Sequence, residues 1–296
     1  MGEMNGEMGR ITESEVKPYT SREVLHMMRH DAKEKDPTKT DTTIRLTPEG
    51  RMHAHDLASS DTDMDQSVAF GSPRDRAQET AGHIMAGGQA EITGEETLEE
   101  LKQKLDAGRD FGSKIGIDSR LNFTLEKGNP YVDEVYEYFN AGRHMEYTVN
   151  QSDRRAAELG DETNFTYSRS AKAVAEVVLK YLHIAPRFDQ LANDQSKGYS
   201  DTLERFLGSH QGLFESFLAK VIENTKGVEE RNKFVDAVDK QGFGFSEGYT
   251  IEIQNHGTEK PTIHLTYHKE NKQNPEKSFE FDEDISTELV QEIAQG

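Results

Sequence analysis

The 296-residue chain carries 35 Lys and Arg against 55 Asp and Glu, which gives a formal net charge of −20. That balance disfavours non-specific nucleic-acid binding, because such binding needs basic side chains to displace counterions. Cysteine is absent, which excludes a disulfide framework and thiol chemistry, and no apolar run in the sequence reaches the length of a membrane span. We therefore expect a cytoplasmic protein that binds neither nucleic acid nor membrane.

The first part of the chain alternates short apolar strands with helices. Residues 1–21 are polar and lack hydrophobic periodicity, so we expect a flexible lead-in. The stretch REVLHMMRH at 22–30 predicts a buried strand that ends abruptly in charged residues. Thr47, followed by proline, predicts a helix cap, and SVAFGS at 67–72 predicts a second strand. The next helix is expected to open at Pro73.

The same alternation continues through residue 224 and favours a mostly parallel sheet covered by helices. We predict a polar helix at 95–107, a strand and loop at 115–123, helices within 129–160, an amphipathic helix at 168–185, a strand at 204–210 and a helix at 211–223.

Beyond residue 245 the pattern changes to strict alternation of apolar and polar residues, which predicts antiparallel strands closed by a short helix at 286–295. The predicted fold is therefore an α/β three-layer sandwich with a mostly parallel central sheet, plus a C-terminal antiparallel meander. We divide the chain into the lead-in at 1–21, an α/β domain at 22–225 and a C-terminal extension at 226–296 packed on the same domain.

Three of the predicted strands deliver histidine or serine to the loop that follows them: His30, Ser72 and His210. In a parallel sheet the carboxyl ends of the strands share one edge, so these residues are expected to lie close together. Arg76 would sit in the first turn of the helix after Ser72, where free backbone N–H groups add positive charge. Such a cluster favours binding of a phosphate group.

Four motifs, in chain order MMRHDAK, LTPEGRMHAHDLA, GSPRDRAQETA and GSHQG, resemble the histidine phosphatase (phosphoglycerate mutase-like) superfamily over about residues 23–224. The resemblance implies a phosphatase in which His30 attacks phosphorus and forms a phosphohistidine that water then cleaves. It also implies that Arg29, Arg76 and His210 hold the phosphoryl oxygens and neutralise their charge. No metal and no cofactor are required, because arginines supply the charge.

The chain departs from the family pattern at two positions. Asp31 replaces the usual glycine after Arg-His, and its carboxylate would repel a phosphate unless it points away. Phe123 follows Arg-Leu-Asn where the family's mutase-like members have a glutamate that donates a proton. We take Glu126 as the first substitute acid and Asp118 as the second. Without an acid, leaving groups that depart unprotonated, such as phenolates, acyl phosphates or phosphohistidine, are preferred.

Other interpretations remain open at this point. The chain could be a non-catalytic module that binds a phospho-ligand or a protein, and mutase or metal-dependent chemistry is less favoured. The pairs His26 with His30 and His53 with His55 have the wrong geometry for metal ligands, so we expect solvated or capping histidines. The expected partner is a small phosphorylated substrate or a phosphoprotein, and the sequence predicts neither its identity nor the oligomeric state.

Overall fold

The computed structural model describes residues 19–296 except 111, 127 and 258. The predicted lead-in at 1–21 lies almost entirely outside the described residues. The strands are β1 (Ser21–Arg29), β2 (Val68–Gly71), β3 (Ile115–Ile117), β4 (Thr202–Ser209), β5 (Gly248–Asn255), β6 (Thr262–Lys269) and β7 (Phe279–Ile285). The α-helices are α1 (Pro48–Asp56), α2 (Asp75–Ala86), α3 (Leu98–Asp106), α4 (Pro130–Asn140), α5 (His144–Tyr147), α6 (Asp153–Glu158), α7 (Tyr167–Ala192), α8 (Leu213–Lys226), α9 (Val228–Ala237) and α10 (Thr287–Gln295).

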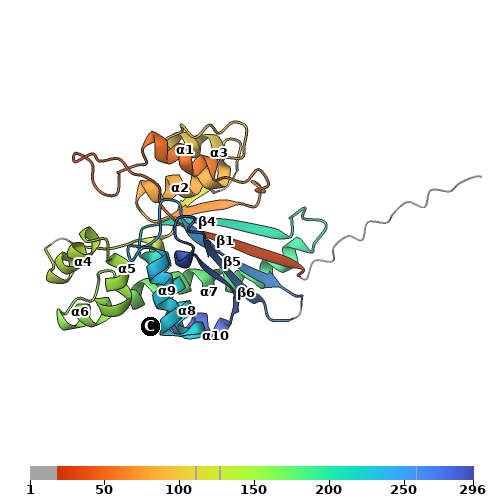
Figure 1. The fold of residues 1–296 in the computed structure, drawn as a ribbon. Coiled ribbons are helices and arrows are strands. Elements are labelled where there is room, and N and C mark those ends of the chain that lie inside the picture. The colour runs from red at the N-terminus through yellow and green to blue at the C-terminus, as the bar shows by residue number, and fades with distance from the viewer. Residues whose placement is uncertain (1–18, 111, 127, 258) are drawn as a thin grey trace, which may run out of the picture.

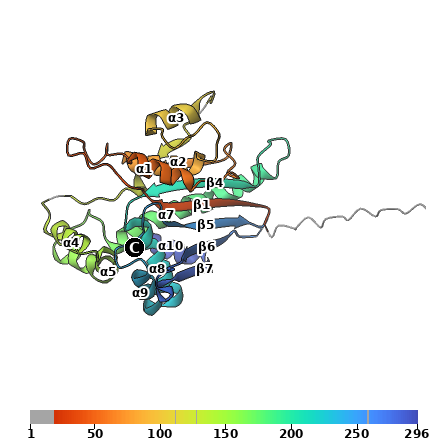
Figure 2. The same cartoon turned by 45° about the horizontal axis from the view of Figure 1, so that its top comes forward.

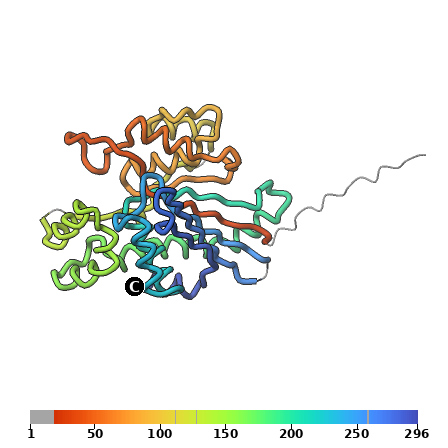
Figure 3. The backbone as a smooth tube through the Cα atoms, in the orientation of Figure 1, coloured from red at the N-terminus to blue at the C-terminus, as the bar shows by residue number. Residues whose placement is uncertain are grey.

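Among the described residues, all seven strands join one sheet in the order β3-β2-β4-β1-β5-β6-β7. Strands β1 to β4 pair in parallel, whereas β5 pairs antiparallel with β1 and continues into β6 and β7. Figure 2 shows this order from β4 down to β7, and Figure 3 traces the blue C-terminal meander beside the red β1. The predicted α/β fold, with a parallel core followed by antiparallel strands, is confirmed.

Helices cover both faces of the sheet and so create two cores (Figure 1). Helices α1 to α3 lie on one face, where Met28 of β1 and Phe206 of β4 pack against the apolar side of α2. Helices α7, α8 and α10 lie on the other face, where Leu25 and Met27 of β1 join a larger core. Because neighbouring side chains of a strand point to opposite faces, the continuous apolar run of β1 serves both cores.

Helix α7 is longer than predicted. The sequence predicts that it ends at residue 185. The next residue, Pro186, has no backbone donor, and a proline inside a helix clashes with the preceding turn. The helix instead continues to Ala192 with Pro186 inside it. Pro186 is exposed, and Phe188 is buried in the core on the far side of the proline. The Asp189 carboxylate accepts hydrogen bonds from Thr20 and Ser21, which anchors the last turns.

The site-bearing edge of the sheet faces a separate group of short helices. Helices α4 to α6 lie at the left of Figure 1, on the side toward which β1 runs, and the loop between β1 and α1 projects on the same side. The predicted boundary after residue 225 falls at the end of α8, and β5 to β7 extend the same sheet that contains β1.

Candidate active site

The three parallel strands β1, β2 and β4 end next to one another and place His30, Ser72 and His210 at one edge of the sheet. The His30 backbone N–H donates to the Ser209 carbonyl at 2.8 Å, and the Ser72 N–H donates to the Gly208 carbonyl at 3.1 Å. These bonds extend the sheet by one residue beyond each strand. The predicted meeting of the three strand ends is therefore present in the structure.

Two glycines allow helix α2 to lie close against these strand ends. A Cβ atom on Gly71 would lie 2.4 Å from the Gln78 backbone nitrogen, and one on Gly208 would lie 2.1 Å from the Ala77 carbonyl oxygen. Both distances are far below van der Waals contact, so any larger residue would push α2 away from the sheet. The close packing brings Arg76, in the first turn of α2, to the strand ends.

His30 is buried and held in one tautomer by its two neighbours. Its Nδ1 lies 2.7 Å from the Asp31 carbonyl oxygen, which can only accept, so Nδ1 carries the proton. Its Nε2 lies 3.3 Å from Nε of Arg76, which can only donate, so Nε2 presents its lone pair. Burial and the Arg76 cation lower the pKa of His30 to about 3, and the imidazole is neutral at physiological pH.

Arg76 uses all three guanidinium nitrogens in this structure. Besides Nε at His30, its Nη1 donates to the Asp41 carbonyl oxygen at 2.6 Å and its Nη2 lies 3.1 Å from the Asp41 carboxylate. The side chain is only 4% exposed. A phosphate bound by the Nη groups would therefore have to displace Asp41.

Asp41 is the point where three cations converge. Its carboxylate contacts Nε of Arg74 at 2.5 Å as well as Arg76, and Nζ of Lys33 lies 3.8 Å away. Although partial burial favours the protonated form, the Arg76 and Arg74 cations lower the pKa of Asp41. Sequence reasoning missed this residue, because the loop DPTKTDTT carries no periodic signal.

His210 lies beside His30 with a ring-to-ring distance of 5.1 Å. Its Nε2 is 2.7 Å from the Ser72 hydroxyl oxygen, which also accepts the Arg74 backbone N–H. Burial, with the positive field of the surrounding groups, lowers the pKa of His210 well below its usual value, so this imidazole is neutral too.

Arg29 completes the cluster at the end of β1. Its Nη1 donates to the Phe243 carbonyl, and its guanidinium carbon lies 4.9 Å from the centre of the Phe245 ring. Its Nε is buried and has no hydrogen-bond partner among the described residues. A buried donor without a partner is costly, and a bound oxyanion is one group that would satisfy it.

The Asp31 carboxylate is held by groups other than His30, Arg76 and His210. One oxygen accepts the Ala32 backbone N–H at 2.6 Å, and the other contacts Nδ1 of His53 at 2.5 Å and accepts the Ser246 hydroxyl at 2.6 Å. His53 is thus a partner of Asp31. Among the described residues, no group of three or more His, Asp or Glu side chains is arranged to hold a metal ion.

The two candidate proton donors are not brought into contact with His30. The Glu126 side chain is exposed and has no hydrogen-bond or ion-pair partner in the described part of the chain. The Glu126 backbone N–H donates to the side chain of Asn164. Asp118 pairs with Nε of Arg120 at 2.9 Å, and its pKa is lowered because the bonds and charge of Arg120 outweigh its burial. A low pKa makes Asp118 a poor acid near neutral pH.

Phe123, which follows Arg-Leu-Asn in the sequence, lies beside His210. Its ring centre lies 6.4 Å from the ring of His210 and 4.4 Å from that of Phe165. His144, which is fully buried beside these rings, has no hydrogen-bond partner on either ring nitrogen among the described residues. Burial and the Arg29 cation lower the pKa of His144 to about 4.

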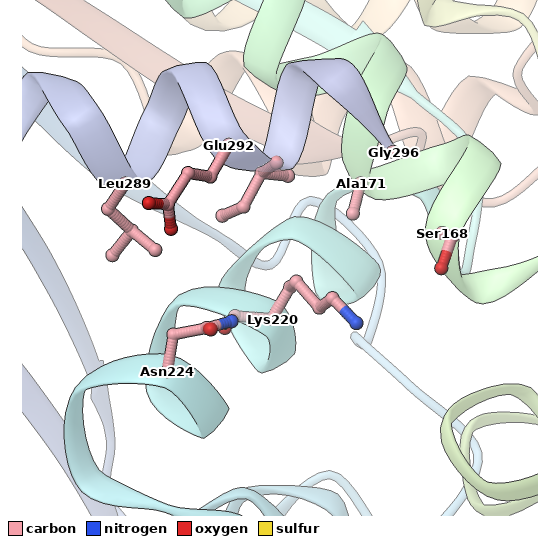
Figure 4. Close-up of a pocket in the computed structure, with 8 residues that line it drawn as sticks. Ser168, Ala171, Lys220, Asn224, Leu289, Glu292 and Gly296 are labelled. Carbon is pink, nitrogen blue, oxygen red and sulfur yellow. The ribbon is translucent and has the colours of Figure 1, made fainter.

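Two cavities of the described structure lie apart from this cluster. The crevice in Figure 4 is bounded by α7, α8 and α10, with Lys220, Asn224 and Glu292 in its wall. A second cavity of about 310 Å³ lies on the α1–α2 face of the sheet beside His26 and Phe206. Neither is lined by His30, Arg76 or His210.

No helix in the described ranges is long and apolar enough to cross a membrane.

Residues 25–111 match the family model described as histidine phosphatase superfamily (branch 1). The resemblance inferred from the motifs is thus confirmed over this segment, which contains Arg29, His30 and Arg76. The matched range ends before His210. No curated protein matches the chain.

Solved structures with related folds share little sequence with this chain. A mycobacterial glucosyl-3-phosphoglycerate phosphatase is 13% identical, with a TM-score of 0.43 and coverage of 79% of this chain and 90% of that one. A phosphoglycerate mutase from Bacillus anthracis is 12% identical, with a TM-score of 0.46 and coverage of 92% and 97%. A putative phosphohistidine phosphatase from Agrobacterium tumefaciens is 13% identical, with a TM-score of 0.31 and coverage of 79% and 91%.

Proposed function

We propose that the protein is a phosphatase that hydrolyses a phosphorylated compound, small or part of a protein, through a phosphohistidine on Nε2 of His30. The observation that carries this proposal is the state of His30. Its Nδ1–H is fixed on the Asp31 carbonyl, and its Nε2 lone pair faces Arg76. A neutral imidazole with no proton on Nε2 is a competent nucleophile near neutral pH once Arg76 gives up its hydrogen bond to that nitrogen.

In the proposed reaction, the Nε2 lone pair of His30 forms a bond to phosphorus while the bond to the leaving-group oxygen breaks. The leaving group departs with that electron pair, and the phosphoryl group stays on His30. A water molecule then attacks phosphorus, which releases inorganic phosphate and returns the pair to Nε2. Arg29 and Arg76 would stabilise the negative charge on the phosphoryl oxygens, and His210 with Ser72 would supply uncharged hydrogen-bonding groups.

The charge distribution supports an anionic substrate. The chain as a whole is strongly acidic, with a net charge of −20. Around His30, however, Lys33, Arg74 and Arg76 converge on a single carboxylate, and Arg29 lies at the end of the same strand. A local positive field of this kind is what attracts a phosphate to an acidic protein.

The proposed substrates are phosphates whose leaving groups depart without a proton. Among the described residues, no carboxyl group with a raised pKa contacts His30. Glu126 has no contact with the cluster, and the pKa values of Asp118 and Asp41 are lowered by paired cations. General-acid catalysis is worth about 10²- to 10⁴-fold, so esters of strongly basic alcohols are expected to react slowly. The leaving groups that remain are phenolates, the carboxylates of acyl phosphates and the imidazole of phosphohistidine.

The test is a substrate panel run on wild type, on His30→Ala and on His183→Ala, an exposed histidine of α7 that serves as the matched control. We expect His30→Ala to abolish turnover and His183→Ala to retain it. Rates for a series of aryl phosphates should fall steeply as the leaving-group pKa rises. A flat dependence would mean that a working acid exists and would overturn the leaving-group proposal.

Phe123 favours one alternative function, namely a binding module that keeps the phosphate site without turnover. A module of this kind would bind inorganic phosphate or a phospho-ligand and release no phosphate from any member of the panel. Binding with loss of affinity in Arg76→Met, combined with no turnover in wild type, would support it over the phosphatase.

A further inference from the structure

Two phenylalanines lie beside the residues to which we assign phosphate binding, and neither is explained by the chemistry proposed above. Phe245 lies over the guanidinium of Arg29 at 4.9 Å, and Phe123 lies 6.4 Å from the ring of His210. Arg29, the last residue of β1, directly precedes His30, the proposed nucleophile. The ring of His210 contacts the ring of His30. Each phenyl group is thus one residue removed from His30.

Phe245 is exposed, yet its position is fixed. The residue is 50% exposed. The adjacent Ser246 has a left-handed φ of +55°, a conformation that costs a non-glycine residue energy and persists only where contacts enforce it. The enforcing contacts are the Ser246 hydroxyl on Asp31 at 2.6 Å and the Arg29 side chain on the Phe243 carbonyl.

The same loop is tied down from its other side. The Phe243 backbone N–H donates to the buried carboxyl group of Glu215 at 2.8 Å, and that group also accepts the Gly212 N–H at 2.8 Å. The loop that carries Phe245 is therefore fastened to β1, to Arg29 and to the start of α8. A half-exposed ring on a loop held in this way is pre-organised for a ligand, because the loop needs little further ordering on binding.

Phe123 provides the second aromatic surface. It packs on Phe165 at 4.4 Å, and Phe165 in turn stacks on the buried ring of His144 at 5.4 Å. Phe123 itself is only partly buried. An apolar ring at the position expected for a carboxylate removes a proton donor and adds a face on which another ring can pack.

We propose that Phe245 and Phe123 form the subsite for an aromatic leaving group, so that the substrates are phosphate esters of phenols, including the phosphotyrosine side chain. This inference rests on the proposed phosphatase function. A phenolate oxygen can carry the electron pair of the broken P–O bond and take its proton from water afterwards, which suits a site without a facing acid. Arg29 would then contact the phosphate as well as the phenyl ring of Phe245, where cation–π attraction favours aromatic neighbours.

The experiment compares two esters whose leaving groups have similar acidity but different shape, phenyl phosphate and hexafluoroisopropyl phosphate. We expect wild type to prefer the aromatic ester about tenfold or more in kcat/KM. Phe245→Ala should lose about 3- to 10-fold on phenyl phosphate, the usual worth of an aromatic contact, and change little on the fluorinated ester. The control is Tyr199→Ala, an equally exposed aromatic residue outside the site, which should affect neither ester.

Phe123→Leu and Phe123→Ala are measured alongside, because the ring is partly buried and the larger truncation could destabilise the fold. Selective loss on the aromatic ester in the folded leucine variant supports the subsite. Equal rates for the two esters in wild type, or equal losses on both in Phe245→Ala, would overturn it. If neither ester reacts and His30→Ala changes nothing, the phosphatase proposal itself fails, which is a distinguishable result.

A final arm separates two sources of the same phenolic ester. A phosphotyrosine peptide and free phosphotyrosine share the aryl phosphate but differ in the chain around it. Reaction of both supports the subsite, with the higher kcat/KM identifying the source. Reaction of only an acyl phosphate or a phosphohistidine peptide, with neither aryl ester, would contradict the aromatic assignment while keeping His30 as nucleophile.

Discussion

Asp41→Asn is the perturbation for which the structure makes the most specific prediction. The Asp41 carboxylate contacts Nη2 of Arg76 at 3.1 Å and Nε of Arg74 at 2.5 Å. A phosphate bound in this site would need the same two nitrogen donors. The side chain of Asp41 is 51% exposed, so solvent screens these contacts. We therefore expect the carboxylate to act as a resident competitor of the substrate phosphate, and its neutralisation to strengthen phosphate binding.

The size of the effect follows from the geometry. Two unit charges at about 3 Å interact by roughly 1 kcal/mol in water and several times more in a protein interior, and a half-exposed pair lies near the lower value. Removal of the competing charge should thus favour phosphate by about 1 to 2 kcal/mol, which corresponds to roughly 5- to 30-fold in affinity. Asparagine keeps the shape of the side chain, and the Asp41 carbonyl still accepts from Nη1 of Arg76.

The assay is competitive inhibition by inorganic phosphate and by vanadate at pH 7 and low salt. The matched control is Asp36→Asn in the same loop, because the Asp36 carboxylate accepts hydrogen bonds from Thr38 and makes no hydrogen bond or ion pair with Arg76 in the described part of the chain. We expect tighter inhibition in Asp41→Asn alone, and the gain should shrink as ionic strength rises. Unchanged or weaker inhibition in Asp41→Asn would refute the idea that this carboxylate competes for the phosphate site.

Three further changes test the packing and electrostatics around the site. Burial raises the pKa of Glu23 to about 8, so between pH 4.5 and pH 8 the folded state keeps a proton that the unfolded chain releases, and stability falls as the pH rises through that window. In denaturant titrations, Glu23→Gln should therefore raise the free energy of unfolding by roughly 2 to 4 kcal/mol at pH 9 and change it little at pH 4. The pKa of His144 is lowered to about 4, so wild type loses stability as the pH falls from 6.5 towards 4. His144→Leu should stabilise the folded state by about 1 kcal/mol at pH 7 and by more at pH 5, and equal effects at the two pH values would contradict this. Gly208→Ala places a Cβ 2.1 Å from the Ala77 carbonyl oxygen, so it should cost about 1 to 3 kcal/mol of stability and reduce turnover by displacing Arg76. Turnover by this variant at the wild-type rate would show that α2 need not pack so closely.

The strand ends could be predicted from sequence because they depend on local patterns. The apolar runs before His30, Ser72 and His210 are short and bounded by polar residues, and alternation with helices implies a parallel sheet. A parallel sheet has one carboxyl edge, so the meeting of distant segments follows from topology alone. The two glycines before Ser72 and Ser209 carry the same information, because each permits the close approach of α2.

Residues contributed by loops could not be predicted in this way. Asp41 reaches Arg76 from a segment whose composition indicates only a loop, and Phe245 reaches Arg29 across more than two hundred residues of chain. Neither position shows a periodic pattern, and their contacts depend on backbone conformations such as the left-handed Ser246. The direction of the Asp31 carboxylate is also a tertiary property, since His53 and Ser246 come from different elements.

A proton donor could not be predicted from the motifs alone. Register along the chain favours Glu126 and Asp118, but register does not determine whether a side chain reaches His30. Asp118 caps the turn at Ser119–Leu121 and pairs with Arg120, which is a structural use of the carboxylate. Whether Glu126 takes part in the reaction stays a prediction, which Glu126→Gln tests through the dependence of rate on leaving-group pKa.

The most direct test of the account is to trap the phosphorylated enzyme. Wild type is mixed with an aryl phosphate, quenched in base within milliseconds and digested, and the peptide that carries the phosphoryl group is sequenced by mass spectrometry. The account predicts one acid-labile phosphoryl group on His30, formed no more slowly than turnover and absent from His30→Ala. A phosphoryl group on another residue, or full turnover in His30→Ala, would contradict it.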